Sequence, residues 1–253
     1  MLVTVARTGR VLNLFTPDTP EWGVRDAAVA LRMPKSSVHE FFTSLSRIGL
    51  LRRTPSGRYR LGWRLLTISA DLLKGSGFEA RAHRIVAEVS GHVGETMTIG
   101  AWDGLHVVCV ASAAGRANGY SVTPGAVLPG HATALGKLLL ASLPWETVLS
   151  IIGRFGLPGC TAMTVQDVTA FERQLNSIRP TGIAYEYEEY TAGLACVATG
   201  VYKRGDLVAA VSVTAPVDRM RVRREEFAAA ARGTARALVR PEVRSGALRQ
   251  ARP

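Results

Sequence analysis

One short segment combines hydroxyl, imidazole and basic side chains at helical spacing. Pro34 suits the first turn of a helix, and Gly49 suits the left-handed residue that follows one. Between them, apolar residues recur at the 3.6-residue period, so the polar residues share the opposite face. A helix face of this chemistry can bind phosphates and base edges of DNA. The candidates for base reading or groove contact are Ser36, Ser37, His39, Glu40 and Thr43.

A second group of basic residues follows directly after Gly49. Two short alternating stretches flank Pro55-Ser56-Gly57, a strong turn signal, so a β-hairpin is expected. Arginines on such a hairpin would lie against the DNA backbone, or one would enter the minor groove. With two basic residues of the helix, they give the phosphate candidates Lys35, Arg47, Arg52, Arg53, Arg58 and Arg60.

These side chains need a scaffold, and the flanking sequence predicts one. A shorter amphipathic helix over Val24–Leu31 comes first, and only Arg32 and Met33 separate it from Pro34. Such a short connection is typical of a helix-turn-helix corner. With the hairpin behind it, the order is that of a winged helix-turn-helix, whose second helix enters the major groove. A small helical bundle with a solvated arginine hairpin is the alternative interpretation.

The charge distribution favours the DNA interpretation. The net charge is +11, and residues 1–62 hold 10 basic and 4 acidic side chains. Residues 79–215 hold 9 and 11, while residues 216–253 again hold 10 and 4. The N-terminal segment therefore carries the charge that suits a polyanion. The arginines near the C-terminus are interpreted as a solvated helix face and a frayed basic tail.

Composition limits the other possibilities. A chain of 253 residues allows one large or two modest domains, and 47% hydrophobic residues can bury a real core. No uninterrupted run of about 18 apolar residues predicts a membrane span, and the N-terminus lacks the apolar core of a signal peptide. Three widely spaced cysteines are typical of reduced thiols. We therefore expect a cytoplasmic, nucleoid-associated protein without a membrane partner.

The chain is expected to divide near residue 63. Residues 1–62 form the DNA-binding domain, and residues 63–78 form a linker helix over Trp63–Leu73 followed by a break at Lys74–Gly77. A helix this apolar must bury its surface, and the same helix of a second subunit is the expected partner. Residues 79–240 form the second domain, and residues 241–253 form the tail.

The second domain is predicted to be α+β, with helices mixed with antiparallel hairpins. Asp103-Gly104 marks the clearest hairpin turn, and Thr164 to Asp167 resembles a capping box that opens a helix. The expected helices cover residues 82–93, 131–143, 145–152, 164–178 and 223–239. The expected strands cover residues 96–102, 105–111, 183–188, 194–202 and 207–214.

Four ordered segments resemble the IclR family of bacterial transcriptional regulators over nearly the whole chain. They are Met33–His39, Leu50–Arg53 with Gly57–Gly62, Leu128–Lys137, and Glu188–Tyr190 with Gly193–Ala198. The resemblance implies a winged helix-turn-helix, a linker helix and a GAF-like effector-binding domain. It also implies homodimers, often paired into homotetramers, on a palindromic operator. Members of the family repress more often than they activate.

One residue departs from the family pattern in the second helix. The family usually has arginine after the histidine, where this chain has Glu40. A carboxylate there repels phosphate but can accept a hydrogen bond from cytosine N4. We therefore expect a changed operator preference rather than a loss of DNA binding.

The resemblance also implies an effector pocket for a small organic or aromatic acid on the inner face of the second domain's sheet. Ser212 and Thr214 are two residues apart on an expected strand, so their hydroxyls face the same side. Glu186 would have to be protonated, or turned toward a hydroxyl or amine. A helix that opens at His131 would offer free N–H groups to an anion. The matching positions are His131, Ala132, Ala134, Glu186, Cys196, Ser212 and Thr214.

Other interpretations of these residues remain open from the sequence. Ser212 and Thr214 could face solvent, Cys196 could be a small core residue, and His131 could cap a helix or satisfy a carbonyl. Cys196 and His131, with Glu186 or Glu188, could form a nucleophile, base and orienter in an enzyme. No nucleophile elbow, P-loop or dinucleotide fingerprint accompanies them, and no metal-ligand pair occurs, so neither catalysis nor a metal or cofactor is expected. A scaffold that senses ligand without binding DNA is a third possibility.

Overall fold

The computed structural model describes residues 2–76, 78–116 and 119–239, and the basic tail expected at residues 241–253 lies outside them. The chain divides into two compact units, one within residues 1–76 and one within residues 77–253. No helix in the described part is long and apolar enough to cross a membrane.

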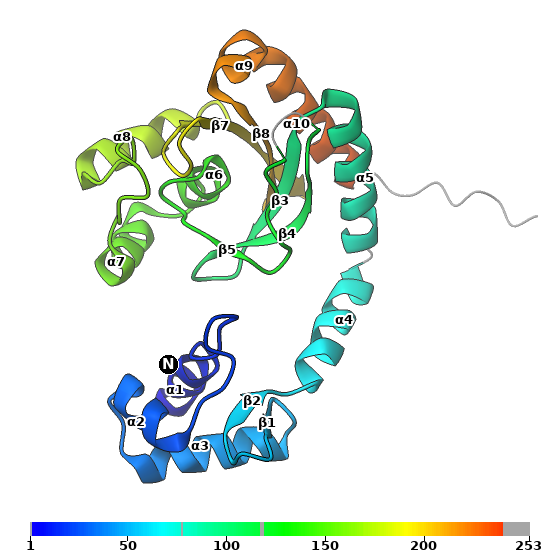
Figure 1. The fold of residues 1–253 in the computed structure, drawn as a ribbon. Helices are drawn as coiled ribbons and strands as arrows, with labels where there is room; N and C mark the ends of the chain where they lie inside the picture. The colour runs from blue at the N-terminus through cyan, green and yellow to red at the C-terminus, as the bar shows by residue number, and fades with distance from the viewer. Residues whose placement is uncertain (1, 77, 117–118, 240–253) are drawn as a thin grey trace, which may run out of the picture. The chain divides into compact units, whose positions relative to one another are not determined.

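The N-terminal unit has the order predicted for a winged helix-turn-helix (Figure 1). Its elements are α1 (Val3–Leu12), α2 (Val24–Leu31), α3 (Lys35–Arg47), β1 (Leu51–Arg53), β2 (Tyr59–Leu61) and α4 (Arg64–Ser76). The predicted helix pair and hairpin are confirmed. Helix α1, in which only Val11 is buried and Val3 and Val5 are exposed, was not expected from the sequence.

Local backbone chemistry shapes the corner and the wing. Arg32 ends α2 in the left-handed region, with φ 53°, and the chain enters α3 through Met33 and Pro34. Gly49 adopts φ +78° after α3, as its position predicts, because glycine enters that region without strain. Phe42 of α3 packs against Tyr59 of the wing, with ring centroids 4.7 Å apart, so a single core joins helix and hairpin.

The C-terminal unit is an antiparallel sheet with helices on both faces, which confirms the predicted α+β class (Figure 1). The six strands lie in the order β5-β4-β3-β8-β7-β6. The strands are β3 (Thr96–Trp102), β4 (Val107–Ala113), β5 (Val127–Leu128), β6 (Ile183–Tyr187), β7 (Leu194–Lys203) and β8 (Asp206–Pro216). The helices are α5 (Phe78–Val93), α6 (Ala134–Ala141), α7 (Trp145–Phe155), α8 (Val168–Ile178), α9 (Val217–Val222) and α10 (Arg224–Val239).

Strand alternation divides the apolar residues between two cores. On β7, Ala195 and Val197 pack with α5 and α10, whereas Cys196 and Ala198 face α6. On β8, Val211 and Val213 belong to the first core, so the intervening Ser212 faces the α6 side. The predicted common orientation of the two β8 hydroxyls is therefore confirmed, and the face they share is the one that α6 covers.

Two expected helix starts are wrong. The helix expected from His131 begins at Ala134, because the side chain of Thr133 accepts the N–H of Gly136 and caps it. The helix expected from Thr164 begins at Val168, because Asp167 takes the capping role through the N–H of Ala170. Each helix starts after the residue whose hydroxyl or carboxylate accepts a free N–H three residues further on. The first polar residue of the segment does not set the start.

Other boundaries shift for local reasons. Of the break expected over Lys74–Gly77, the part before Gly77 is wrong, since α4 continues to Ser76, and Gly77 lies outside the described residues. A helix tolerates an interior glycine at about 1 kcal/mol. The strand expected from Leu105 begins at Val107, because the Asp103 carboxylate holds the N–H groups of Leu105 and His106 in the turn. The short elements β5 and α9 were not expected.

Candidate DNA-binding face and effector pocket

The polar face of α3 points away from the core of the N-terminal unit. Val38, Phe42 and Leu45 are buried on the inner side. Ser37 and Thr43 are half-buried at the edges of the opposite face. The exposed candidates on that face are Lys35, Ser36, His39, Glu40 and Arg47. Five of the seven predicted contact residues of this helix are thus exposed, and the other two flank them.

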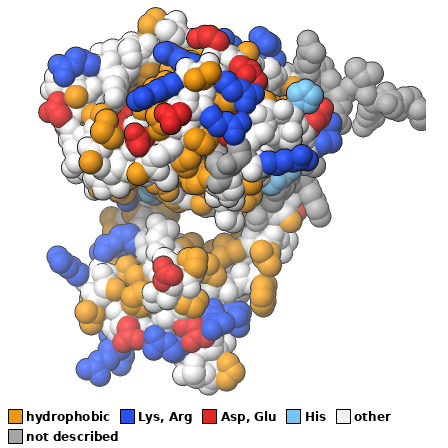
Figure 2. Space-filling model, turned by 45° about the horizontal axis from the view of Figure 1, so that its top comes forward, with side chains coloured by type: hydrophobic (Ala, Val, Ile, Leu, Met, Phe, Trp, Pro, Cys, Tyr) orange, Lys and Arg blue, Asp and Glu red, His pale blue; other side chains and the backbone are white. Residues whose placement is uncertain are grey.

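Two arginines of the wing are engaged by acidic residues of the same unit. The guanidinium of Arg58 lies 3.1 Å from the Asp26 carboxylate and donates to the carbonyl oxygen of Glu21 at 3.3 Å. Arg60 Nε lies 2.5 Å from Glu21 Oε1. Basic and acidic side chains accordingly alternate on the surface of this unit (Figure 2). The charge that these two arginines offer to phosphate is partly neutralised within the unit.

The other two wing arginines differ from this pair. Arg52 is half-buried, and its guanidinium lies 5.4 Å from the centre of the Trp63 ring, a cation–π contact. Arg53 is exposed, and no ion pair is found for it in the described part of the chain. Arg53 is therefore the wing residue whose charge is most available to a phosphate.

A small polar pocket lies between α6 and the sheet in the C-terminal unit. Its volume is about 20 Å³, and no lysine or arginine of the described residues lines it. Ser212, Thr214 and Cys196 come from neighbouring strands, and the Cys196 thiol lies 3.0 Å from the Thr214 hydroxyl. The polar lining is Thr98, Tyr120, Thr133, Tyr190, Cys196, Ser212 and Thr214.

The start of α6 forms one wall of this polar pocket. Ala134 and Leu135 line it, and their backbone N–H groups lie in the first turn of α6, where no intrahelical acceptor exists. The positive end of the helix dipole is therefore directed at a ring of hydroxyl groups. This arrangement can hold an anion by hydrogen bonds without a cationic side chain.

Glu186 lies behind the wall of the polar pocket and does not line it. It pairs with Cys196 across β6 and β7, and its Oε2 accepts the N–H of Glu189 at 2.9 Å. Burial raises the pKa of Glu186 to about 7, although hydrogen bonds from Cys196 and from the Glu189 backbone oppose that rise. The carboxyl group therefore changes charge near neutral pH.

A buried ion pair, which the sequence analysis missed, joins α6 to the segment after β6. Lys137 is fully buried, and its Nζ contacts the Glu189 carboxylate. Burial lowers the pKa of Lys137, and the charge of Glu189 opposes that shift. A lone lysine within an otherwise apolar, wholly buried helix is the signal that could have predicted it, since such a lysine needs a carboxylate. The residue supplying that carboxylate, 52 positions along the chain, could not have been read from the sequence.

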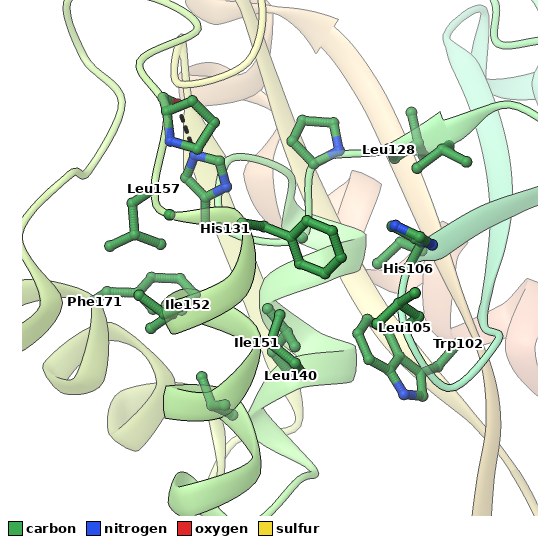
Figure 3. Close-up of a pocket in the computed structure, with 18 residues that line it drawn as sticks. Trp102, Leu105, His106, Leu128, His131, Leu140, Ile151, Ile152, Leu157 and Phe171 are labelled. Atoms are coloured by element: carbon green, nitrogen blue, oxygen red, sulfur yellow. Dashed lines mark hydrogen bonds between the residues drawn. The ribbon is translucent and has the colours of Figure 1, made fainter. Parts of the chain in front are cut away.

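His131 and Ala132 lie away from the polar pocket. His131 Nε2 is 2.8 Å from the carbonyl oxygen of Pro158, and His131 lines a separate apolar cavity (Figure 3). Ala132 is fully buried and lines neither. The structure thus favours the interpretation in which His131 satisfies a nearby carbonyl.

The groups of the alternative enzyme hypothesis are not arranged as a nucleophile and base. Cys196 lines the polar pocket and His131 the apolar cavity, and no hydrogen bond between them is found in the described part. Burial raises the pKa of the Cys196 thiol well above its usual value, which disfavours the thiolate. The described residues also contain no cluster of three side chains that could hold a metal ion.

Both units match known families. The family described as "Bacterial transcriptional regulator IclR C-terminal" matches residues 70–240, and the "IclR helix-turn-helix domain" matches residues 4–55. The chain is 28% identical over 224 residues to the HTH-type transcriptional regulator XynR of Escherichia coli, covering 87% of this chain and 88% of XynR.

Two solved structures share the fold. A Silicibacter sp. TM1040 protein assigned to the IclR transcriptional regulators gives a TM-score of 0.84 at 24% identity, covering 93% of this chain and 94% of that one. An IclR homologue from Microbacterium hydrocarbonoxydans, in complex with 4-hydroxybenzoate, gives 0.73 at 24% identity, covering 93% and 97%. The chain therefore belongs to the IclR family of transcriptional regulators, with an N-terminal DNA-binding helix-turn-helix and a C-terminal ligand-binding domain.

Proposed function

We propose that this regulator binds a palindromic operator and that a small carboxylic acid in the polar pocket changes that binding. The observation that carries the proposal is the composition of the pocket: hydroxyl groups and the N-terminus of α6 converge without a lysine or arginine. By analogy with its relatives, the regulator acts as a repressor.

The DNA contacts follow from exposure and charge. The exposed face of α3 enters the major groove, with Ser36, His39 and Glu40 near base edges and Lys35 at a phosphate. Ser37 and Thr43 flank this face, and Arg47 contacts the backbone. On the wing, Arg53 makes the main phosphate contact, and Arg52, Arg58 and Arg60 have supporting roles.

The acid is held by Ser212 and Thr214 on one side and the first turn of α6, at Ala134, on the other. Cys196 completes the floor, and protonated Glu186 supports it without repelling the carboxylate. The 4-hydroxybenzoate complex of a structural relative supports a carboxylate ligand.

The size of the polar pocket restricts the ligand. A volume of about 20 Å³ holds about one water molecule. A carboxylic acid therefore requires the pocket to widen, and Tyr120, Val122 and Tyr190 are lining residues that lie in segments without regular secondary structure. A compact acid needs the least widening, so we place short-chain acids before aromatic ones.

Assembly follows from α4. Its exposed apolar side chains pair with the same helix of a second subunit, giving a homodimer whose two-fold symmetry matches a palindrome, and dimers associate further into tetramers. The ligand re-angles the paired helices and changes the spacing of the half-sites, a shift between existing populations. The protein performs no catalysis, since Cys196 and His131 act separately, and it works on the chromosome in the cytoplasm.

The proposal is tested by selecting fragments from a pool of genomic DNA with the full-length protein at physiological salt. Sequencing should reveal a few palindromic sites, and a panel of short-chain and aromatic acids should contain members that change their retention. Retention without sequence preference, lost at moderate salt, would contradict specific operator binding. Specific retention that no acid alters would contradict only the proposed ligand class.

A further inference from the structure

A second, larger cavity in the C-terminal unit has no role in the proposed function. Its volume is about 330 Å³, within the range of small-molecule sites. It lies where the β3–β4 turn, α6 and α7 meet (Figure 3). It is separate from the polar pocket and shares only Leu128 with it.

The lining of this apolar cavity excludes a charged ligand. Aromatic and branched side chains dominate it, among them Trp102, Phe155, Phe171, Leu140 and Ile151. Among the described residues, no lysine, arginine, aspartate or glutamate lines it, and its titratable lining residues are the histidines His106 and His131. An ion placed there would lose its hydration without meeting a permanently charged side chain, whereas a flat apolar molecule would lose only unfavourable contact with water.

His131 supplies one directed polar atom. Its side chain is buried, with 6% of the residue exposed, and it lines the cavity. The Pro158 carbonyl can only accept a hydrogen bond, so Nε2 must carry the hydrogen that joins them at 2.8 Å. In the neutral ring, Nδ1 is then an acceptor, and no partner for it is found among the described residues. Figure 3 shows the ring beside the aromatic and aliphatic lining.

We infer that this cavity binds an uncharged aromatic molecule that bears one hydroxyl or N–H group, such as a simple phenol. The ring packs against the aromatic and aliphatic lining, and the donor group hydrogen-bonds to His131 Nδ1. A hydrocarbon bound against His131 Nδ1 would exclude water from this acceptor without replacing its hydrogen bond, so a ligand with a donor is preferred to a hydrocarbon of the same shape.

The chain segment between the two sites links them. Pro129, Gly130 and His131 line the apolar cavity, and Thr133, Ala134 and Leu135 line the polar pocket. A ligand that shifts this segment changes both sites. If the polar pocket binds the acid as proposed above, the phenol alters acid affinity by about 5- to 150-fold, the usual size of such coupling.

The test is calorimetric titration of the full-length protein, without DNA. The titrants are 4-methylphenol, which has the hydroxyl donor, and toluene, which has the same ring without it. One 4-methylphenol should bind per chain, and binding should be at least tenfold weaker in Ile151→Trp, which fills the cavity from α7. Leu149→Trp is the matched control, since Leu149 lies on the same helix, is 42% exposed and does not line the cavity. Its affinity should change less than twofold.

A second variant separates the polar contact from folding. His131→Phe should weaken 4-methylphenol severalfold more than toluene, whereas a folding defect would weaken both alike. Absence of saturable binding to the wild type at millimolar 4-methylphenol would overturn the inference. Unchanged 4-methylphenol binding by Ile151→Trp would also overturn it. If Ile151→Trp altered the sedimentation of the protein and not its affinity for 4-methylphenol, the cavity would instead be an interface between subunits. Because no DNA or acid is required, failure here leaves the proposed regulation untouched.

Discussion

Glu186 connects the protonation of the C-terminal unit to the ligand that we propose for it. The residue is 2% exposed, and its carboxyl group lies against Cys196, which lines the polar pocket. Because burial raises its pKa to about 7, the group is neutral in mildly acidic solution and charged in mildly basic solution. A carboxylate ligand is repelled only by the charged form.

Acid affinity is therefore expected to fall as the pH rises through about 7. We expect titrations at pH 6 and pH 8, with a carboxylic acid that alters operator binding, to show a severalfold weaker affinity for that acid at pH 8. Glu186→Gln should remove most of this dependence, and Glu146→Gln, at an exposed position of α7, should retain it. An undiminished pH dependence in Glu186→Gln would assign the titration to another group.

The same residue makes stability depend on pH. In the unfolded chain Glu186 loses its proton near pH 4.5, whereas in the folded chain it keeps it to about pH 7. The folded state thus binds more protons in that interval, and this contribution to stability is full below pH 4.5 and lost by about pH 7. Urea unfolding at pH 5 and pH 8 measures the free energy of unfolding of both proteins. Relative to the wild type, this free energy should be higher for Glu186→Gln at pH 8 than at pH 5, by up to roughly 3 kcal/mol. A constant difference between the two proteins would contradict the raised pKa.

The wing is the element in which sequence and structure give different weights to the same residues. All four arginines are phosphate candidates by type, but Arg58 and Arg60 pair with Asp26 and Glu21. Exposed ion pairs contribute little to stability, commonly less than about 1 kcal/mol, so DNA can compete for these arginines. The acidic partners nonetheless reduce the free energy of DNA binding that contacts with Arg58 and Arg60 can contribute.

Arg53→Ala is expected to weaken binding to all DNA sequences about equally and to make the salt slope of log K shallower by about one. Arg58→Ala should have a smaller effect, and Asp26→Asn should strengthen binding by freeing Arg58. Fluorescence anisotropy measures all three effects, with a selected and a scrambled duplex at salt concentrations from about 50 to about 200 mM, a range over which phosphate contacts make the affinity fall steeply. A changed sequence preference with an unchanged slope in Arg53→Ala would contradict the phosphate role.

Elements with strong local signals could be predicted from the sequence, and those defined by distant contacts could not. The α2–α3 corner and the wing depend on Pro34, Gly49 and the Pro55–Gly57 turn, which act on their immediate neighbours. By contrast, α1 buries only Val11 and has no side-chain cap, so its pattern is weak.

The proposed effector site shows the same division. Alternation on a strand predicted that Ser212 and Thr214 share a face. Tyr120 and Tyr190, which also line the site, come from segments without regular secondary structure. His131 lies outside the site, because α6 begins only after Thr133. Those placements depend on packing between segments far apart in the chain, which no local spacing encodes.

At the scale of the whole molecule, α4 carries apolar surface that a monomer leaves in water. Trp63, just before α4, and Leu66, Ile68 and Leu72 within it are all about half exposed or more. Several large apolar side chains exposed on one short helix mark an interaction site. A dimer joined through α4 would bury it and present two recognition helices to one palindrome.

Leu72→Lys is expected to weaken the dimer at least tenfold, because a charge would then be buried in an apolar interface. Thr67→Lys adds the same charge on another side of α4 and should have a small effect, which also controls for added attraction to DNA. Sedimentation equilibrium at micromolar concentration distinguishes the two variants. A wild-type dimer that Leu72→Lys leaves intact would place the interface elsewhere.

In the proposed function, an acid in the polar pocket controls sequence-specific DNA binding. The most direct test is the affinity of the full-length protein for a selected palindrome and for a scrambled duplex, with and without an acid from the panel. We expect at least about a 1,000-fold preference for the palindrome. Adding the acid should change the affinity by about 5- to 150-fold, and the double variant Ser212→Ala with Thr214→Val should abolish that change. Equal affinity for both duplexes would contradict the account, as would an acid response that survives loss of both hydroxyls.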